Sequence, residues 1–231
     1  KILAPKLYEY NLKKGIIVIE DFGDLSFYNV LTNKKNKFLI YKKLIDLLIK
    51  IQKIKPKSKL KNIINKSHIV NKYSNKYLHK ESDLFFNWYL PSFLNKKKNK
   101  KIKIKAKKIL SKLYNKLNFS NSYFVHRDYH AQNLMKIGNK VGVIDSQDAL
   151  IGHPAYDLVS LVDDVRIKTS NKLKNQICNY YLKKSKKIHK IKLKKFLEDF
   201  NILSVQRSLK IIGIFSRLFK RDKKNKYLKF I

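Results

Sequence analysis

The sequence predicts an α+β fold that is mainly helical and carries one small β-hairpin. Three observations support this prediction. Apolar residues recur every three or four positions over long segments, which is typical of amphipathic helices. Two short apolar runs flank Gly138-Asn139-Lys140, a sequence suited to a tight turn. The 231 residues, 44% of them hydrophobic, are enough to bury a substantial core.

The N-terminal quarter of the chain predicts one strand followed by a helix. Ile16–Ile19 is a short apolar run after the turn Lys13-Lys14-Gly15, which predicts a short buried strand. The helix ends before Pro56, and its apolar positions follow spacings of three and four: Phe38, Tyr41, Leu44, Ile45, Leu48 and Ile51.

The middle of the chain predicts two further helices. The apolar pattern of Leu84–Tyr89 indicates a helix that stops near Pro91. A third helix is predicted over Ile102–Leu117. The segment Lys96–Lys108, which overlaps the start of this helix, holds nine Lys in 13 residues. Because Lys near a helix start opposes the macrodipole, we expect the first half of this segment to be a solvated loop.

The second half of the chain predicts three strands and then helices. The strands are Tyr123–Val125, Leu134–Ile137 and Val141–Ile144, the last two joined as a hairpin. A helix is expected after Pro154, with one apolar face formed by Leu158, Leu161, Val162 and Val165. Further helices are predicted over Lys172–Lys183, Leu193–Asn201 and Ile202–Phe219.

The charge of the chain is strongly positive, with 54 Lys and Arg against 16 Asp and Glu. Only five of the basic residues are Arg, the residue preferred for phosphate and base contacts. Lys, Asn and Ile are encoded by A+T-rich codons, so we interpret most of the +38 charge as background and nucleic acid as an unlikely partner. Polyanion binding through the Lys surface is the alternative, and it predicts a steep salt dependence.

Two further features bound the class of protein. No stretch approaches 18 consecutive apolar residues, so no membrane partner is predicted. Cys178 is the single cysteine and cannot form an internal disulfide, which favours a reducing, cytoplasmic location.

The window Leu117–Val165 reverses the charge of the chain. It contains three basic residues and six aspartates, a net charge of −3. Three of the six glycines also lie here. Carboxylates gathered at strand ends and loops are what a divalent-cation and proton-transfer site requires.

A specific motif lies inside this window. His126-Arg127-Asp128 is followed, after four intervening residues, by Asn133, which gives the pattern H-R-D-x-x-x-x-N of kinase catalytic loops. Asp145 follows directly after the second, apolar strand of the predicted hairpin, Val141–Ile144. Asp128 is therefore the candidate catalytic base, and the oxygens of Asn133 and Asp145 are candidate Mg²⁺ ligands.

A second motif has the letters of a kinase signature but the wrong position in the chain. Asp21-Phe22-Gly23 spells the D-F-G of protein kinases, but it precedes the catalytic loop instead of following it. We therefore interpret Glu20, Asp21 and Phe22 as part of a hinge between lobes. The metal-binding segment is predicted to be Asp145-Ser146-Gln147-Asp148.

At these residues the chain resembles the aminoglycoside phosphotransferase family, relatives of choline and protein kinases. Within that family it is most similar to bacterial kinases that phosphorylate the anomeric hydroxyl of N-acetylmuramate and N-acetylglucosamine in cell-wall recycling. The segments that carry the resemblance are VIEDFGD (18–24), ESDLFFNWYL (81–90), HRDYHAQNLM (126–135), GVIDSQDALIGHPAYDLVSLVDD (142–164) and QRSLKIIGIFSRL (206–218).

The resemblance implies a protein-kinase-like fold and phosphoryl transfer from ATP, with Mg²⁺, to a hydroxyl of a small molecule. It implies that Asp128 is the base and that Asn133 and Asp145 hold Mg²⁺. Asp148 would support the metal or phosphate, and a structural role near the loop falls to Asp157. We expect His126 and Arg127 to position the loop, and Glu20, Asp21 and Phe22 to contact the nucleotide.

The chain also departs from the family pattern. Ser146 stands where the family usually has Phe, and no G-x-G-x-x-G occurs. We therefore expect residues 1–24 to be a remnant of the N-terminal lobe with the hinge, residues 25–231 to be the C-terminal lobe, and the N-terminal lobe to be largely missing. A catalytically silent binding module and a choline or aminoglycoside kinase are the alternatives. Whether Arg207 or Arg217 contacts substrate, and the oligomeric state, stay open.

Overall fold

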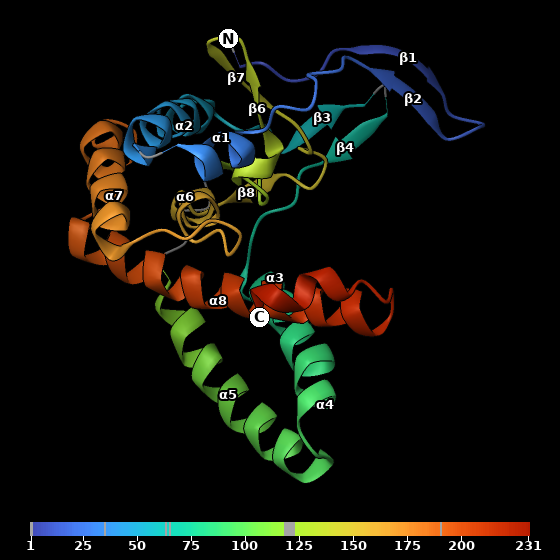
Figure 1. Ribbon diagram of the computed structural model, residues 1–231, viewed down its shortest axis with the longest axis vertical. Helices are drawn as coiled ribbons and strands as arrows, with labels where there is room; N and C mark the ends of the chain where they lie inside the picture. The colour runs from blue at the N-terminus through green and yellow to red at the C-terminus, as the bar shows by residue number, and fades with distance from the viewer. Residues whose placement is uncertain (1, 35, 63, 65, 118–122, 190) are drawn as a thin grey trace.

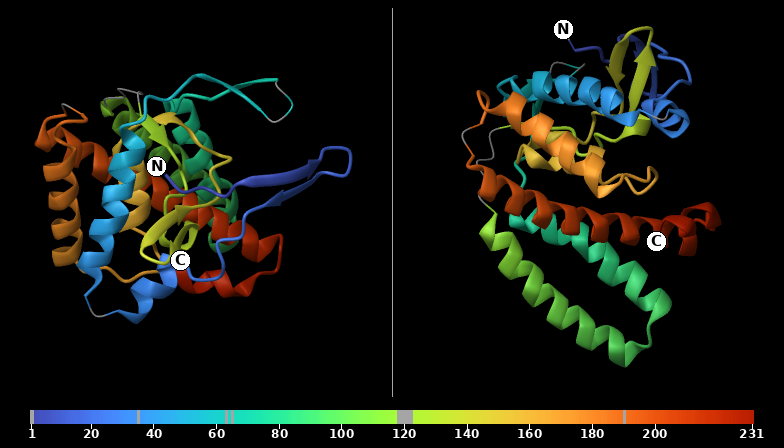
Figure 2. Two further views of the ribbon diagram at one scale, coloured as in Figure 1. Left: turned by 90° about the horizontal axis from the view of Figure 1, so that it is seen from above. Right: turned by 60° about the vertical axis from the view of Figure 1, so that its left-hand side comes forward.

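The computed structural model describes residues 2–34, 36–62, 64, 66–117, 123–189 and 191–231 (Figure 1). The described part is an α+β structure that combines helices with short antiparallel strand pairs. The strand pairs lie at one end, the long helix α8 crosses the middle, and a pair of helices projects beyond it (Figures 1 and 2).

The chain begins with a ribbon of two antiparallel strands, β1 (Leu7–Asn11) and β2 (Ile16–Ile19). Gly15 has φ +64° in the turn between them, a conformation that glycine adopts without strain. The ribbon extends away from the rest of the chain (Figure 2, left). The predicted strand is confirmed, but its predicted burial is wrong, because among the described residues β2 pairs only with β1, and both strands are exposed.

Two helices follow the ribbon, α1 (Phe27–Asn33) and α2 (Lys37–Gln52). Ser26 caps α1 by accepting a hydrogen bond from the amide of Asn29. The predicted helix before Pro56 is confirmed as α2, and all of its predicted apolar positions except Phe38 are buried. A short hairpin of β3 (Lys59–Lys61) and β4 (Ser67–Ile69) comes next.

The helix predicted to stop near Pro91 runs further. It consists of α3 (Asn75–Leu84), a π-helical turn η1 (Phe85–Tyr89) and α4 (Leu90–Phe93). In the π turn the amide of Leu90 reaches back five residues to the carbonyl of Phe85. Pro91 then lies in the first turn of α4, where its missing N–H costs little.

The Lys-rich segment is helical from its start, so the predicted loop is wrong. Helix α5 spans Lys96–Lys116. Asn95 provides the N-cap, since its side chain accepts a hydrogen bond from the amide of Lys98 at 2.9 Å. Lys103 Nζ lies 3.0 Å from the side-chain oxygen of Asn87 in η1. Lys107 Nζ lies 2.5 Å from the carboxylate of Asp83 in α3. A cap and these contacts therefore outweigh the unfavourable charge at the helix start.

The predicted strands of the acidic window are confirmed. β5 (Tyr123–Val125) pairs with β8 (Leu150–Gly152), and β6 (Leu134–Ile137) pairs with β7 (Lys140–Val143) in the predicted hairpin. Gly138, with φ +55°, makes the turn. A 3₁₀ turn, η2 (Ala131–Asn133), connects the catalytic loop to β6.

Helix α6 (Ala155–Val162) follows Pro154, as predicted, but it ends before Val165, which was expected on its apolar face and is 38% exposed. All eight of its residues are buried. It lies between the strand pairs and α8 (Figure 1), so no face of it reaches solvent.

The two helices predicted over 193–219 are one continuous helix, α8 (Leu193–Lys220), which follows α7 (Asn171–Ser185). Gly213 lets α8 approach η1, because a Cβ at this position would lie 2.3 Å from the carbonyl carbon of Leu84. The chain ends in a 3₁₀ segment, η3 (Asn225–Phe230).

In the part of the chain that the structure describes, no helix has both the length and the apolar character needed to cross a membrane. The expectation that the N-terminal lobe is largely missing stays a prediction.

Candidate active site

The catalytic-loop motif leaves β5 and is fixed by α6. The carboxylate of Asp157 accepts hydrogen bonds from the amides of His126 (2.8 Å) and Arg127 (3.0 Å). His126 is buried, and its Nε2 donates to the carbonyl of Ile144 at 2.9 Å. These contacts tie the loop to α6 and to the segment that carries Asp145. They are the contacts that loop-positioning residues need.

Arg127 has φ +72°, in the left-handed region that residues with a side chain rarely adopt. Its carbonyl accepts hydrogen bonds from Ser160 Oγ (3.1 Å) and Arg207 Nη1 (3.2 Å). Its guanidinium donates to Glu81 Oε1 at 2.6 Å and to the carbonyl of Asp148 at 3.3 Å. The strained residue is thus held at its amide, carbonyl and side chain.

Asp128 follows this fixed residue and remains reachable, with 37% of its side chain exposed. Its Oδ1 lies 3.9 Å from Arg207 Nη1 and 4.0 Å from Lys210 Nζ. Partial burial acts to raise the pKa of Asp128, but Lys210 and then Arg207 and His130 outweigh it and lower the pKa. The carboxylate is therefore ionised at neutral pH, which is the state that accepts a proton.

The two predicted Mg²⁺ ligands lie at the same end of the β6–β7 hairpin. The pairing of Leu134 with Val143 continues through a hydrogen bond from the amide of Ile144 to the carbonyl of Asn133, 3.1 Å. The side-chain nitrogen of Asn133 donates to the carbonyl of Asp128 at 3.0 Å, which leaves its side-chain oxygen available. Asp145, the next residue after Ile144, is exposed and has φ +61°.

This donor set fits Mg²⁺ carried on nucleotide phosphates. Mg²⁺ is usually bound through one or two protein oxygens and otherwise by phosphates and water. Among the described residues, no group of three or more His, Cys, Asp and Glu side chains could hold a metal alone. Asn133 and Asp145 offer one amide oxygen and one carboxylate at one end of a hairpin beside Asp128. This set matches a Mg²⁺ ion that takes one or two protein oxygens and its other ligands from phosphates and water.

Asp148 contacts Arg127. Its carbonyl accepts from the guanidinium, and its Oδ2 lies 4.0 Å from Arg127 Nη1. The side chain is 65% exposed. Its predicted support of the metal or phosphate stays a prediction.

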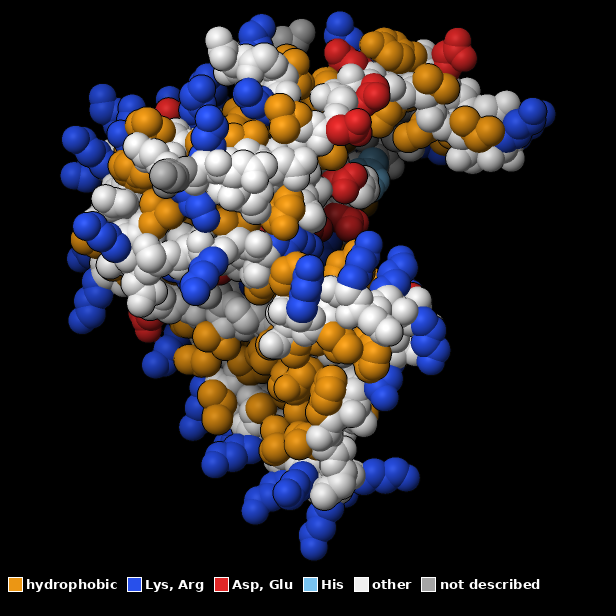
Figure 3. Space-filling model, viewed as in Figure 1, with side chains coloured by type: hydrophobic (Ala, Val, Ile, Leu, Met, Phe, Trp, Pro, Cys, Tyr) orange, Lys and Arg blue, Asp and Glu red, His pale blue; other side chains and the backbone are white. Residues whose placement is uncertain are grey.

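The predicted hinge residues and Asp145 line one cavity of about 650 Å³. Its lining includes Glu20, Asp21 and Phe22 together with Met135, Ile144 and Asp145. The ring of Phe22 packs on the backbone of β7, where a Cβ at Gly142 would lie 2.7 Å from it. Acidic side chains gather at the hollow between the ribbon and α8, while Lys and Arg cover much of the remaining face (Figure 3).

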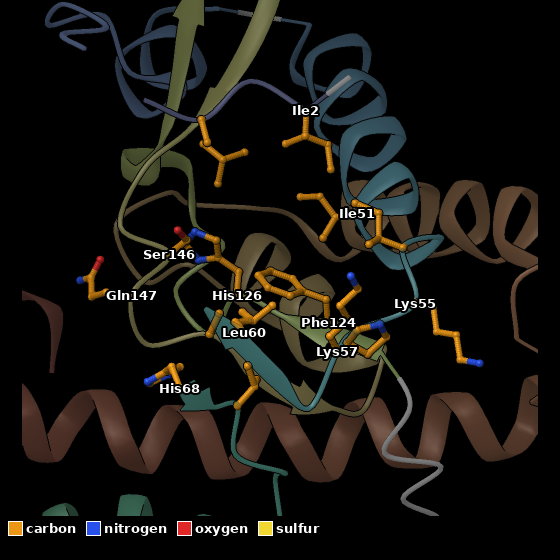
Figure 4. A pocket seen from close by; sticks show the side chains of 16 residues that line it. Ile2, Ile51, Lys55, Lys57, Leu60, His68, Phe124, His126, Ser146 and Gln147 are labelled. Carbon is orange, nitrogen blue, oxygen red and sulfur yellow. The ribbon is translucent and has the colours of Figure 1, made fainter. Parts of the chain in front are cut away.

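A second cavity, of about 600 Å³, lies on the other side of Ser146 and Gln147. Figure 4 shows that Ile2, Ile51, Leu60 and Phe124 point into it, together with His126. Asp128, Asn133 and Asp145 are not among its lining residues. The cavity that Asp145 lines is therefore the candidate nucleotide site.

Sequence reasoning missed Glu81 of α3 and Lys210 of α8. Glu81 accepts hydrogen bonds from Arg127, Tyr73, Tyr156 and Gln206, and its Oε1 lies 3.2 Å from Lys210 Nζ. Burial acts to raise the pKa of Glu81, but Lys210, the Tyr73 hydroxyl and Arg127 lower it to about 2. The sequence offered only an acidic residue in a Lys-rich region, and its burial became visible in the structure. Arg207, left open above, is the α8 residue that bonds to the loop.

Solved structures share this architecture. The chain superposes on an ethanolamine kinase of Plasmodium vivax with a TM-score of 0.63 and 11% identity, covering 99% of this chain and 66% of that one. An ADP-bound aminoglycoside phosphotransferase gives a TM-score of 0.57 and 15% identity, covering 99% and 73%. These similarities confirm the predicted protein-kinase-like α+β fold.

The sequence comparisons are more specific. Residues 1–192 match the model of the phosphotransferase enzyme family, and the chain belongs to that family. The N-acetylmuramate/N-acetylglucosamine kinase of Pseudomonas aeruginosa is 31% identical over 229 residues, covering 97% of this chain and 64% of the relative. The enzyme of the same name from Caulobacter vibrioides is 28% identical over 233 residues, covering 99% and 63%. The chain thus spans just under two thirds of the length of these relatives.

Proposed function

We propose that the protein is a Mg²⁺- and ATP-dependent kinase that phosphorylates a hydroxyl of a small amino sugar. One observation carries the proposal. Asp128 is ionised, and part of its side chain is exposed to solvent. It follows Arg127, which is held by several hydrogen bonds, and it lies near Asn133 and Asp145. Family membership supports phosphoryl transfer, and the similarity to sugar kinases supports the class of acceptor.

In this proposal Mg²⁺-ATP supplies the transferred phosphoryl group when it is bound. Asp128 accepts a hydrogen bond from the acceptor hydroxyl, orients it and takes its proton as the acceptor oxygen bonds to the γ-phosphorus of ATP and the bond from that phosphorus to the leaving ADP breaks. Asn133 and Asp145 offer oxygen ligands to the metal. Asp157 and Arg127 hold the loop, so that Asp128 does not need to reorganise during the reaction.

We also propose the division of labour along the chain. Residues 1–24 serve as the hinge and part of the N-terminal lobe, and residues 25–231 as the C-terminal lobe that holds the catalytic loop. Glu20, Asp21 and Phe22 contact the nucleotide. This proposal is supported by the cavity that these three residues share with Asp145.

The acceptor is proposed to be an N-acetylated amino sugar, phosphorylated at its anomeric hydroxyl. The support is the identity of 26–31% with four kinases named for N-acetylmuramate and N-acetylglucosamine. The choline kinase and aminoglycoside phosphotransferase structures are 14–15% identical to the chain, and this similarity supports the fold without indicating the acceptor.

The test is an acceptor panel with the full-length gene product and ATP. We expect transfer to N-acetylmuramate or N-acetylglucosamine, little transfer to choline or gentamicin, and loss of transfer when Mg²⁺ is chelated. Faster transfer to choline or gentamicin would replace the acceptor class. No transfer to any acceptor from a protein that binds Mg²⁺-ATP would support a silent binding module instead.

A further inference from the structure

Helix α8 brings three polar side chains to the back of the catalytic loop. Gln206, Arg207 and Lys210 are all buried, with relative exposures of 0%, 3% and 7%. They lie within just over one helical turn, so they share a limited arc of α8. Buried charges of this kind are rare unless they are paired.

These side chains meet the loop in two places. Arg207 donates to the carbonyl of Arg127 at 3.2 Å, and its Nη1 lies 3.9 Å from Asp128 Oδ1. Lys210 lies 3.2 Å from Glu81 Oε1 and 4.0 Å from Asp128 Oδ1. Gln206 donates to Glu81 Oε2 at 2.9 Å.

Glu81 connects the helix to the strained residue of the loop. Its Oε1 accepts the guanidinium of Arg127 and faces Lys210, while its Oε2 accepts from Gln206 and from the hydroxyls of Tyr73 and Tyr156. A carboxylate with this many partners has little freedom to move. The guanidinium that it holds belongs to the residue with φ +72°, directly before Asp128.

We propose that Arg207 and Lys210 are positioning residues for Asp128, acting from α8 on the Arg127 carbonyl and through Glu81 on the Arg127 side chain. The inference rests on the proposed function, because it gives these residues a role in phosphoryl transfer. A left-handed backbone at Arg127 persists only where its surroundings hold it. Releasing Arg127 displaces the Asp128 carboxylate, and a displacement of about 1 Å costs on the order of 100-fold in rate.

The test compares Lys210→Met and Lys210→Arg with Lys194→Met, a matched control at an exposed Lys near the start of α8. In the full-length gene product, we expect Lys210→Met to lower kcat by roughly 100-fold with the KM for ATP changed less than about threefold. Lys210→Arg should recover most of kcat, and Lys194→Met should match the wild type. Wild-type kcat in Lys210→Met, or an equal fall in Lys210→Arg, overturns the proposal.

A second readout does not depend on activity. Hydrogen exchange reports the amides of His126 and Arg127, which are bonded to Asp157. We expect at least about tenfold faster exchange there in Lys210→Met, with α2 unchanged. Unchanged exchange at the loop overturns the proposal. If the wild type transfers no phosphate, the proposed function fails, while the exchange experiment still tests whether α8 holds the loop.

A third variant covers the case in which Lys210→Met does not fold. Arg207→Gln removes the cation at the Arg127 carbonyl and leaves the Lys210–Glu81 pair in place. Arg207 and Glu81 both act on the loop through Arg127. The double variant that combines Arg207→Gln with Glu81→Gln should therefore lower kcat by less than the product of the two single effects. Effects that simply multiply would show independent roles and overturn the shared path.

Discussion

The catalytic loop and helix α5 differ in how many contacts their basic side chains make. Arg127, one of three basic residues in the acidic window, bonds to Glu81 and to the carbonyl of Asp148, and its backbone is fixed by α6 and α8. Helix α5 holds eleven Lys among its 21 residues and no acidic residue. Lys107 pairs with Asp83 and Lys103 with Asn87, both outside α5, whereas Lys96, Lys101 and Lys105 are exposed. A basic side chain takes part in the candidate active site where an acidic side chain pairs with it. A high density of positive charge does not by itself identify a functional site.

The largest effect is expected at the metal segment. Asp145→Asn removes a carboxylate while keeping the left-handed backbone, which Asn tolerates well. We expect kcat/KM for Mg²⁺-ATP to fall by roughly 100-fold or more, because Asp145 is the carboxylate that we propose as a ligand of the metal. Steady-state kinetics over a range of Mg²⁺ concentrations check this. A variant with wild-type Mg²⁺ dependence would remove Asp145 from the metal site.

The second effect concerns Glu81 and acid stability. Its pKa is lowered to about 2 in the folded chain, below the unfolded value near 4.3, so its ion pairs stabilise the fold above that value and are lost as pH falls toward 2. Between pH 4.5 and 2 the free energy of unfolding should fall by about 2 kcal/mol more in the wild type than in Glu81→Gln. Denaturant titrations at several pH values measure the difference. Parallel pH profiles would show that the Glu81 network does not stabilise the fold.

The third effect tests the crossing that brings α8 to the loop. Gly213→Ala places a Cβ 2.3 Å from the carbonyl carbon of Leu84, so α8 and η1 must separate. We expect a loss of about 2 kcal/mol in the free energy of unfolding. Gly138→Ala, at a turn with φ +55° and open space around it, is the control for backbone strain alone, and about 1 kcal/mol is expected there. The reverse order would mean that α8 does not pack closely on η1.

The smallest effect is expected in α5. Lys105→Met and Lys101→Met change exposed side chains, and each should shift the free energy of unfolding by less than about 0.5 kcal/mol and leave kcat unchanged. Thermal melts and steady-state kinetics check both values. A large loss of activity in either variant would show that the Lys-rich surface takes part in catalysis and would break the contrast with the loop.

The sequence was most informative where spacing is local. The H-R-D-x-x-x-x-N motif, the hairpin around Gly138 and Asp145 together span 20 residues, and strand pairing alone brings Asn133 and Asp145 together. It was least informative where contacts join distant segments. Glu81 and Lys210 lie 47 and 82 positions from Asp128, and only the crossing of α3 and α8 brings them to the loop.

The wrong predictions have physical reasons as well. The predicted break within α8 had no Pro or Gly to support it, so the helix continues. The start of α5 was set by the Asn95 cap and by contacts with α3 and η1, which outweigh the adverse charge. The burial of β2 was inferred from its apolar residues, yet the described chain gives it only β1 as a partner.

The most direct measurement of the central claim is phosphoryl transfer by Asp128→Asn in the full-length gene product. The substitution keeps the size of the side chain and removes the proton acceptor. With the melting temperature and the affinity for ADP unchanged, we predict that kcat falls by at least about 100-fold. A folded Asp128→Asn variant that transfers phosphate at the wild-type rate would contradict the assignment of Asp128 as the base.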